Sequence, residues 1–226
     1  MKLKCPSLFS LILKFAFGLV LICPVHAQTQ KENIRVMSYN IHRGGVVMLK
    51  QPLSQTAKAI QLSKADIVGI QETRSPRGDK LEDLAKLLGW NHDMGKGSKI
   101  LTRYEIVESL YKGVKVKLDS GRHAYIFNVH LSSHPYQPYQ LLEIRPKWHK
   151  HTNNITFIKT ETEAIEWAKK ARGAEIAKVL RQVKSIPNKQ VPVFVVGDFN
   201  EPSHLDWTEA AAKADRHPIK VAYPTS

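Results

Sequence analysis

The sequence predicts an α/β fold in which short apolar strands alternate with amphipathic helices that cover a sheet. Four runs rich in Val, Ile, Tyr or Phe have the length and composition of strands: residues 34–40, 66–72, 124–130 and 192–198. Three segments between these runs carry apolar side chains at helical spacing: residues 52–64, 79–88 and 161–183. The chain has 226 residues and shows no internal repeat, so we expect one α/β domain.

Two local signals refine this prediction. Residues 105–118 alternate between polar and apolar side chains around Lys112-Gly113, which predicts a hairpin leading into the strand that ends at His130. Asp79 is a suitable residue to begin the second helix. Helices and strands thus follow one another along most of the chain.

The most informative segment is residues 192–202, where a strand-like apolar run ends in Gly-Asp-Phe-Asn. Side chains alternate between the two faces of an extended chain, so Asp198 and Asn200 should point the same way while Phe199 points into the packing. A carboxylate and an amide held in this way suit a metal, a phosphate or an attacking water. A strand end with ordinary turn chemistry is the alternative, because Gly, Asp, Asn and Pro all favour turns.

Three other predicted strands also end in polar residues. The first runs into Asn40, the second into Gln71-Glu72, and the third into His130 followed by Leu-Ser-Ser-His. Each has an ordinary alternative: a turn asparagine, a helix-entry acid and a hydrogen-bonded histidine at a sheet edge. Their joint occurrence favours one site over separate coincidences.

In order, spacing and residue type these motifs resemble the endonuclease/exonuclease/phosphatase superfamily, the deoxyribonuclease I-like phosphoesterases. Residues 100–106 are also similar to the family's Ile-Leu-Ser-Arg-Tyr-Pro-Ile segment, with Glu105 in place of proline. The resemblance covers roughly residues 34–208. It implies a four-layer α/β/β/α sandwich, in which two mixed sheets lie face to face with helices outside.

The resemblance also implies roles for the strand-end residues. Glu72 would be a metal ligand, with Asn40 beside it at the metal and the phosphate, and the cofactor would be Mg²⁺ or Mn²⁺. His130 would donate a hydrogen bond or proton to the phosphate or the departing oxygen. Asp198 would orient and activate the attacking water, and Asn200 would hold the scissile phosphate.

Further substrate-binding candidates are weaker. Arg74 could contact phosphate, although a surface arginine is the ordinary interpretation. Residues 132–157 predict a long loop over the site, in which Tyr136, Tyr139 and Trp148 either stack on substrate or hold the loop to the domain. Other residues near the motifs are more ordinary surface or framing positions: His42, His134, His204, Arg103 and Tyr104.

The N-terminus predicts a secretory signal peptide over residues 1–27, followed by the enzyme domain over residues 28–226. Lys2 and Lys4 precede an apolar stretch at residues 8–22, and Val25-His-Ala27 supplies small residues for cleavage. A membrane anchor is disfavoured because the uninterrupted apolar part is well below the roughly 20 residues that span a bilayer. We therefore expect a secreted or periplasmic protein.

The two cysteines, Cys5 and Cys23, both lie in this leader. Lipid modification of Cys23 is disfavoured because Leu21 and Ile22 precede it. Disulfides, thiol chemistry and Cys-ligated zinc are thereby excluded from the processed chain.

Charge points to anionic partners. The formal net charge is +14, which favours nucleic acid, an anionic lipid surface or another phosphate-bearing partner. Solubility alone is the alternative, because much of the charge is scattered. Residues 145–151 concentrate basic side chains around a tryptophan. Nothing in the sequence indicates an obligate protein partner.

One departure from the family matters for activity. Members carry a C-terminal Ser-Asp-His segment, and Asp215-Arg-His217 followed by Pro218 is not equivalent to it. We therefore expect a C-terminally truncated domain whose second sheet is incomplete and has an unpaired edge.

These features predict an exported, metal-dependent hydrolase of phosphate esters that prefers phosphodiesters, either a nuclease or a lipid or small-molecule phosphodiesterase. The alternatives are a non-catalytic binding protein on the same scaffold, lacking the Asp-His segment, and an unrelated basic binding module.

Overall fold

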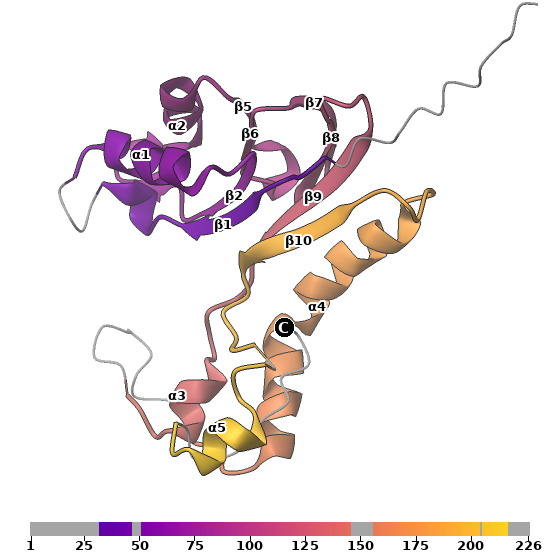
Figure 1. Ribbon diagram of the computed structural model, residues 1–226. Coiled ribbons are helices and arrows are strands. Elements are labelled where there is room, and N and C mark those ends of the chain that lie inside the picture. Colours follow the sequence, from indigo (N-terminus) through magenta and orange to yellow (C-terminus); the bar gives the residue numbers. More distant parts are fainter. Residues whose placement is uncertain (1–31, 47–50, 146–155, 204, 217–226) are drawn as a thin grey trace, which may run out of the picture. The chain divides into compact units, whose positions relative to one another are not determined.

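A computed structural model describes residues 32–46, 51–145, 156–203 and 205–216 (Figure 1). The predicted signal peptide with its cysteines, Trp148 and His204 lie outside the described residues. Among the helices of the described ranges, none combines the length and apolar character needed to cross a membrane.

The first sheet contains four strands in the order β1-β2-β6-β5. Their bounds are β1 Val36–Asn40, β2 Ile67–Gln71, β6 Ile100–Thr102 and β5 Asn91–Asp93. β1 and β2 are parallel, whereas β6 is antiparallel to both of its neighbours. Asn40 is the register partner of Gln71, so Asn40 and Glu72 leave the sheet at the same edge.

The second sheet has the order β10-β9-β8-β7. Its strands are β7 Glu105–Leu110, β8 Gly113–Lys117, β9 His123–His130 and β10 Val193–Asp198. β7 and β8 form the predicted antiparallel hairpin, and β9 and β10 are parallel with Asp198 opposite His130. A separate two-stranded sheet joins β3 (Arg74–Ser75) to β4 (Gly78–Asp79).

Helices cover the outer faces of the two large sheets, which confirms the predicted four-layer arrangement. α1 (Leu53–Ser63) and α2 (Leu81–Leu88) pack on the first sheet through Ile60 and Leu84 (Figure 1). On the second sheet, the C-terminal half of α4 (Glu161–Ser185) packs through Val179. Between the sheets lies a third apolar cluster with these buried members: Ile67, Ile100, Tyr104, Val114, Val116, Leu118, Ala124 and Ile126.

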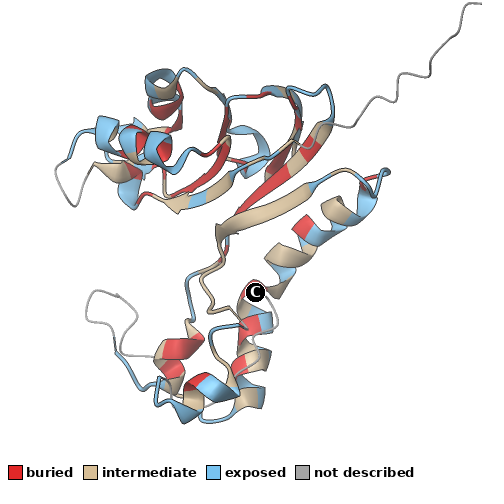
Figure 2. Cartoon of the chain, in the orientation of Figure 1, coloured by how far each residue is buried: buried red, intermediate tan, exposed pale blue. Residues whose placement is uncertain are grey.

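Burial is continuous along much of the central strands β2 and β9 because each sheet is covered on both faces (Figure 2). β2 is buried along its whole length, as expected of a central strand. β10, in contrast, is half-buried throughout, and β9 is its only strand partner among the described residues. β10 is thus an edge strand in the described part of the second sheet.

The two sheets approach each other closely at Gly69. A Cβ atom there would lie 2.8 Å from Asn128 Oδ1 and 2.9 Å from Val196 Cγ2. Asn128 is buried, accepts a 2.6 Å hydrogen bond from Gln71 Nε2, and donates to the carbonyls of Ile70, Ser98 and Lys99. This polar network joins the sheets directly beneath the strand ends.

Some local structure differs from the sequence prediction. Residues 132–157 are not one irregular loop, because α3 (Gln137–Leu141) forms within them and buries Gln137, Pro138 and Gln140. Proline near a helix start is favourable, since it fixes φ and lacks an N–H that would be unpaired there. α4 begins with a capping box between Thr160 and Glu163, and a short helix, α5 (Glu209–Lys213), was not predicted.

Candidate active site

Four strands bring their polar terminal residues to one end of the sandwich. Asn40 ends β1 and Glu72 follows β2 in the first sheet, while His130 ends β9 and Asp198 ends β10 in the second. β1 contacts β10 across the interface between the sheets. The carboxyl ends of two parallel strand pairs therefore converge, one pair from each sheet.

The Asn40 side chain connects the two acidic residues. Its Nδ2 donates a 2.9 Å hydrogen bond to Glu72 Oε1 and another of 2.9 Å to Asp198 Oδ2. Its Oδ1 accepts the backbone N–H of His42 at 2.9 Å, and Glu72 Oε2 accepts the backbone N–H of Arg43 at 3.2 Å. Two carboxylates are thus held on either side of one amide.

His130 lies beside the second of these carboxylates. The distance from His130 Nε2 to Asp198 Oδ2 is 3.9 Å, and the two side chains are 38% and 30% exposed. Asp198 Oδ1 accepts the backbone N–H of Asn200 at 2.9 Å, and Asn200 Nδ2 donates to the carbonyl of Leu131 at 2.9 Å. The segments after β9 and β10 are therefore tied together at the site.

The backbone at this edge adopts uncommon conformations. Glu72 has φ 54° and Asn200 has φ 49°, both in the left-handed region that side chains other than glycine rarely occupy. Such conformations cost of order 1–3 kcal/mol each and are typical of functional sites.

This geometry corrects the extended-chain argument for Asp198 and Asn200. β10 ends at Asp198, and a turn closed by the Asp198 carboxylate brings Asn200 to the same pocket. Phe199 packs against the apolar cluster under α4, as predicted.

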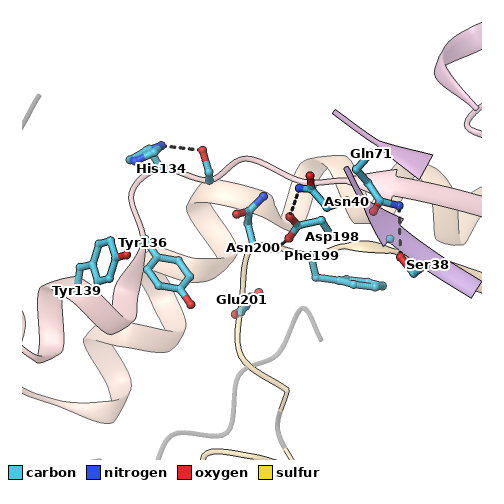
Figure 3. A pocket seen from close by; sticks show the side chains of 12 residues that line it. Ser38, Asn40, Gln71, His134, Tyr136, Tyr139, Asp198, Phe199, Asn200 and Glu201 are labelled. Carbon is cyan, nitrogen blue, oxygen red and sulfur yellow. Dashed lines mark hydrogen bonds between the residues drawn. The ribbon is translucent and has the colours of Figure 1, made fainter. Parts of the chain in front are cut away.

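A cavity of about 650 Å³ opens beside these residues (Figure 3). Asn40 and Asp198 point toward each other on one side of it, and Tyr136 and Tyr139 lie on the other side of Asn200. The two tyrosine rings meet edge to face with centroids 4.9 Å apart, and burial raises the pKa of Tyr136. His134 also lines the cavity.

Arg74 is placed differently from the other substrate-binding candidates. It is exposed on β3 and is not among the residues that line this cavity. Arg103 forms ion pairs with Asp66 and Asp119 at 2.8 and 2.7 Å and stacks on Tyr104, so this pair frames the strands.

The donor set at the strand ends suits a hard cation. The converging side-chain atoms are the carboxylate oxygens of Glu72 and Asp198, on either side of the Asn40 amide nitrogen. Mg²⁺ prefers oxygen ligands and needs only one or two carboxylates, because it retains water and takes up phosphate oxygens. No group of three or more His, Cys, Asp or Glu residues in the described ranges is arranged to hold a metal by itself. The residues present therefore fit a cation held partly by water and substrate.

Four further side chains, which the sequence motifs did not single out, support or line the site. Ser38 and Gln71 line the cavity from the first sheet, and Gln71 Nε2 lies 3.3 Å from Ser38 Oγ. Glu201 lines it from the segment after β10 and contacts Arg172 of α4. Gln71 and Glu201 could have been found from the sequence, because they are adjacent to Glu72 and Asn200. Arg172 lies within a helix, away from any strand-end motif.

Two facing mixed sheets with helices on their outer faces define this protein as a four-layer α/β sandwich. The chain belongs to the Endonuclease/Exonuclease/phosphatase family, whose sequence model matches residues 37–225. This match covers all four strand-end motifs and confirms the resemblance noted from the sequence.

Three individual proteins resemble this chain at low sequence identity. An uncharacterized protein of Caenorhabditis elegans is 29% identical over 217 residues, covering 88% of this chain and 64% of its own length. A mannosyl-6-phosphatase of Bacteroides thetaiotaomicron has a TM-score of 0.43 at 17% identity, covering 74% of this chain and 66% of that one. A β-hairpin deletion mutant of Staphylococcus aureus beta toxin has a TM-score of 0.41 at 14% identity, covering 74% and 67%. The chain thus spans just under two thirds of the length of the nematode relative.

Proposed function

We propose that this chain is an exported hydrolase of phosphate esters that uses Mg²⁺ or Mn²⁺ and prefers phosphodiesters. The observation that carries the proposal is the Asn40 amide held between Glu72 and Asp198, with His130 beside Asp198. Acidic, amide and imidazole groups at one end of the sandwich are the groups that phosphoryl hydrolysis requires; of these four residues, Asn40 and Asp198 line the cavity. Membership of the phosphoesterase family supports the same conclusion.

Each side chain has a role that its position suits. Asp198 accepts a proton from the attacking water, whose oxygen forms the new bond to phosphorus as the ester bond breaks. His130 gives a proton to the departing oxygen, which leaves as an alcohol. Asn200 donates one amide hydrogen to a phosphate oxygen and keeps the other on the Leu131 carbonyl, since its amide carries two. Both Asn40 amide hydrogens are donated to Glu72 and Asp198, so Asn40 holds these two carboxylates beside the phosphate.

A divalent cation held by Glu72 with Asn40 would neutralise charge on the phosphate oxygens. In the described structure the Asn40 amide nitrogen faces the carboxylates, and its oxygen accepts the His42 N–H. The oxygen retains a second lone pair for a cation. Glu72 is thus the main protein ligand in this proposal.

Three observations bear on the substrate. The cavity extends from the strand ends to Tyr136 and Tyr139, which leaves room for organic groups on both sides of the phosphate, as a diester carries. The net charge of +14 favours a polyanion or an anionic surface. Export is inferred from the signal-peptide pattern in residues 1–27.

The test is hydrolysis by the purified chain, with Mg²⁺, of bis-p-nitrophenyl phosphate, double-stranded DNA and phosphatidylcholine vesicles. Asp198→Asn and His130→Ala should each lower kcat by about 10²-fold to 10⁴-fold, the usual contribution of a general base or acid. Asp206→Asn, an exposed aspartate, is the control and should retain activity. Turnover that survives both site substitutions would place the chemistry elsewhere.

A non-catalytic binding protein is the second candidate. It is favoured by the Asn40 amide nitrogen, which already occupies the space between the Glu72 and Asp198 carboxylates. This candidate predicts no turnover of any of the three substrates, together with saturable binding of a phosphodiester that Asp198→Asn and Asn40→Leu alter. Metal-dependent turnover would exclude it.

A further inference from the structure

The side chain of Arg172 is fully buried on α4, directly behind the candidate site. An arginine is almost never fully buried unless it is paired, because an uncompensated buried charge costs several kcal/mol. Its partners therefore identify what the residue holds in place.

Those partners come from two segments that lead away from the site. After β9, Arg172 Nη1 donates to the carbonyls of Ser132 at 3.2 Å and Pro135 at 3.1 Å, and Nη2 donates to Gln137 Oε1. After β10, Arg172 Nε donates to Glu201 Oε2 at 3.4 Å. One guanidinium thus binds both segments to the same point of α4.

Each of these segments also carries residues that line the cavity. The first supplies His134 and Tyr136, and the second supplies Asn200 and Glu201. The Glu201 side chain is fully buried, and Glu201 Oε1 is buried without a hydrogen-bond partner in the described structure. Arg172 is therefore its observed charged partner and fixes where this segment turns after Asn200.

A polar chain extends the contact toward α3. Gln137 is fully buried and its Nε2 donates to Gln140 Oε1 at 3.2 Å, while Gln140 Nε2 donates to the carbonyl of Thr156 at 2.8 Å. The segment around Tyr136 and Tyr139 is thus held through buried hydrogen bonds that begin at Arg172.

We propose that Arg172 is a positioning residue of the candidate site, which sets the segments after His130 and after Asp198 relative to each other. This inference rests on the proposed phosphoesterase function for its kinetic consequence. Its structural consequence is independent: a change at Arg172 should move both segments. Lysine keeps the charge but lacks the planar, multiply donating group, so Arg172→Lys separates positioning from charge.

The test compares Arg172→Lys with Arg181→Lys, an exposed arginine on the same helix, in the full chain. Kinetics with bis-p-nitrophenyl phosphate and Mg²⁺ should show kcat lowered by about 10-fold to 10²-fold, the cost of misplacing groups by about 1 Å, with a smaller change in KM. Arg181→Lys should stay within about twofold of wild type. Backbone amide chemical shifts should change in both segments, residues 131–137 and 198–201, only in Arg172→Lys.

Every outcome of these experiments either supports or overturns the positioning role of Arg172. A folded Arg172→Lys variant with wild-type kcat, or with shifts confined to α4, overturns the proposal. Should the wild-type chain lack phosphoesterase activity, the proposed function fails, and the amide shifts alone decide the positioning role. Should Arg172→Lys not fold, Glu201→Gln takes its place: it keeps the side-chain size and must alter the shifts of residues 198–201 and lower kcat, and wild-type behaviour overturns the proposal.

Discussion

Asn40 and Asp198 are 158 residues apart in the chain, yet Asn40 Nδ2 donates a 2.9 Å hydrogen bond to Asp198 Oδ2. The first residue ends a strand of one sheet and the second ends a strand of the other. The candidate site therefore exists only when the two sheets have packed together. A substitution that loosens this packing should impair the site even where it touches none of the functional groups.

The Glu72 carboxylate should determine divalent-cation binding. Mg²⁺ that binds only the folded chain stabilises it by mass action, by about 2.7 kcal/mol at 100 times its Kd. We expect Mg²⁺ to raise the melting temperature of the wild type, and Glu72→Gln to lose most of that rise because its amide is a weaker ligand. Thermal melts with and without Mg²⁺ measure the difference.

Glu82→Gln is the matched control for this experiment. Glu82 is an exposed residue of α2 that pairs with Lys86, away from the strand ends. It should leave the Mg²⁺ effect unchanged. Equal temperature shifts in the wild type and in Glu72→Gln would mean that the cation binds elsewhere.

Export makes a separate prediction about the start of the processed chain. Val25-His-Ala27 places small side chains at the positions that a signal peptidase recognises. N-terminal sequencing of secreted or periplasmic protein should therefore begin at Gln28. Protein retained in the cytoplasm with Met1 intact would contradict this expectation.

Asp79 should make stability depend on pH at the acidic end. Burial alone would raise the pKa of its carboxyl, but hydrogen bonds from Thr73, from the Leu81 backbone and from Lys99 outweigh burial and lower that pKa below 3.8. The folded state thus favours the ionised form. Its contribution is fully present above pH 3.8 and is lost as the pH falls through the lowered, folded-state pKa.

The corresponding variant is Asp79→Asn. At pH 7 it should lower the free energy of unfolding by about 1.5–3 kcal/mol, the scale of hydrogen bonds to a charged group. Below pH 3.8 the difference from wild type should shrink. Denaturant titrations at pH 7 and pH 2.5 measure it, and a gap that stays constant or grows in acid would refute the assignment.

The strand-end motifs were predictable because they combine two local signals, a β-branched run and a polar residue at its end. Asn40, Glu72, His130 and Asp198 all followed from this pattern, and the structure brings them to one edge. The order of these motifs along the chain also matched the family, and the four-layer sandwich was predicted from that resemblance.

The remaining features depend on contacts that a sequence pattern does not carry. The burial of Arg172 depends on acceptors from two distant segments, and the helix at Gln137–Leu141 depends on packing against α4. Arg74 lies on β3, which pairs with β4 in a separate two-stranded sheet, and it is not among the residues that line the cavity. Tertiary packing decided each of these cases.

Substitution of Gly197 and of Gly173 by alanine should change the stability of the fold in opposite directions. Gly197 precedes Asp198 with φ 152°, and a Cβ there would lie 2.1 Å from the carbonyl oxygen of Val129 on the neighbouring strand. Because backbone atoms must move apart to admit the methyl group, Gly197→Ala should destabilise the fold by about 3 kcal/mol or more and disturb Asp198.

Gly173 lies inside α4, where the nearest atom to a new Cβ would be 4.0 Å away. Alanine favours helix over glycine by about 1 kcal/mol, so Gly173→Ala should stabilise the chain by that amount. Denaturant unfolding of both variants measures the effects, and a Gly197→Ala variant as stable as wild type would show that β9 and β10 are not packed as described.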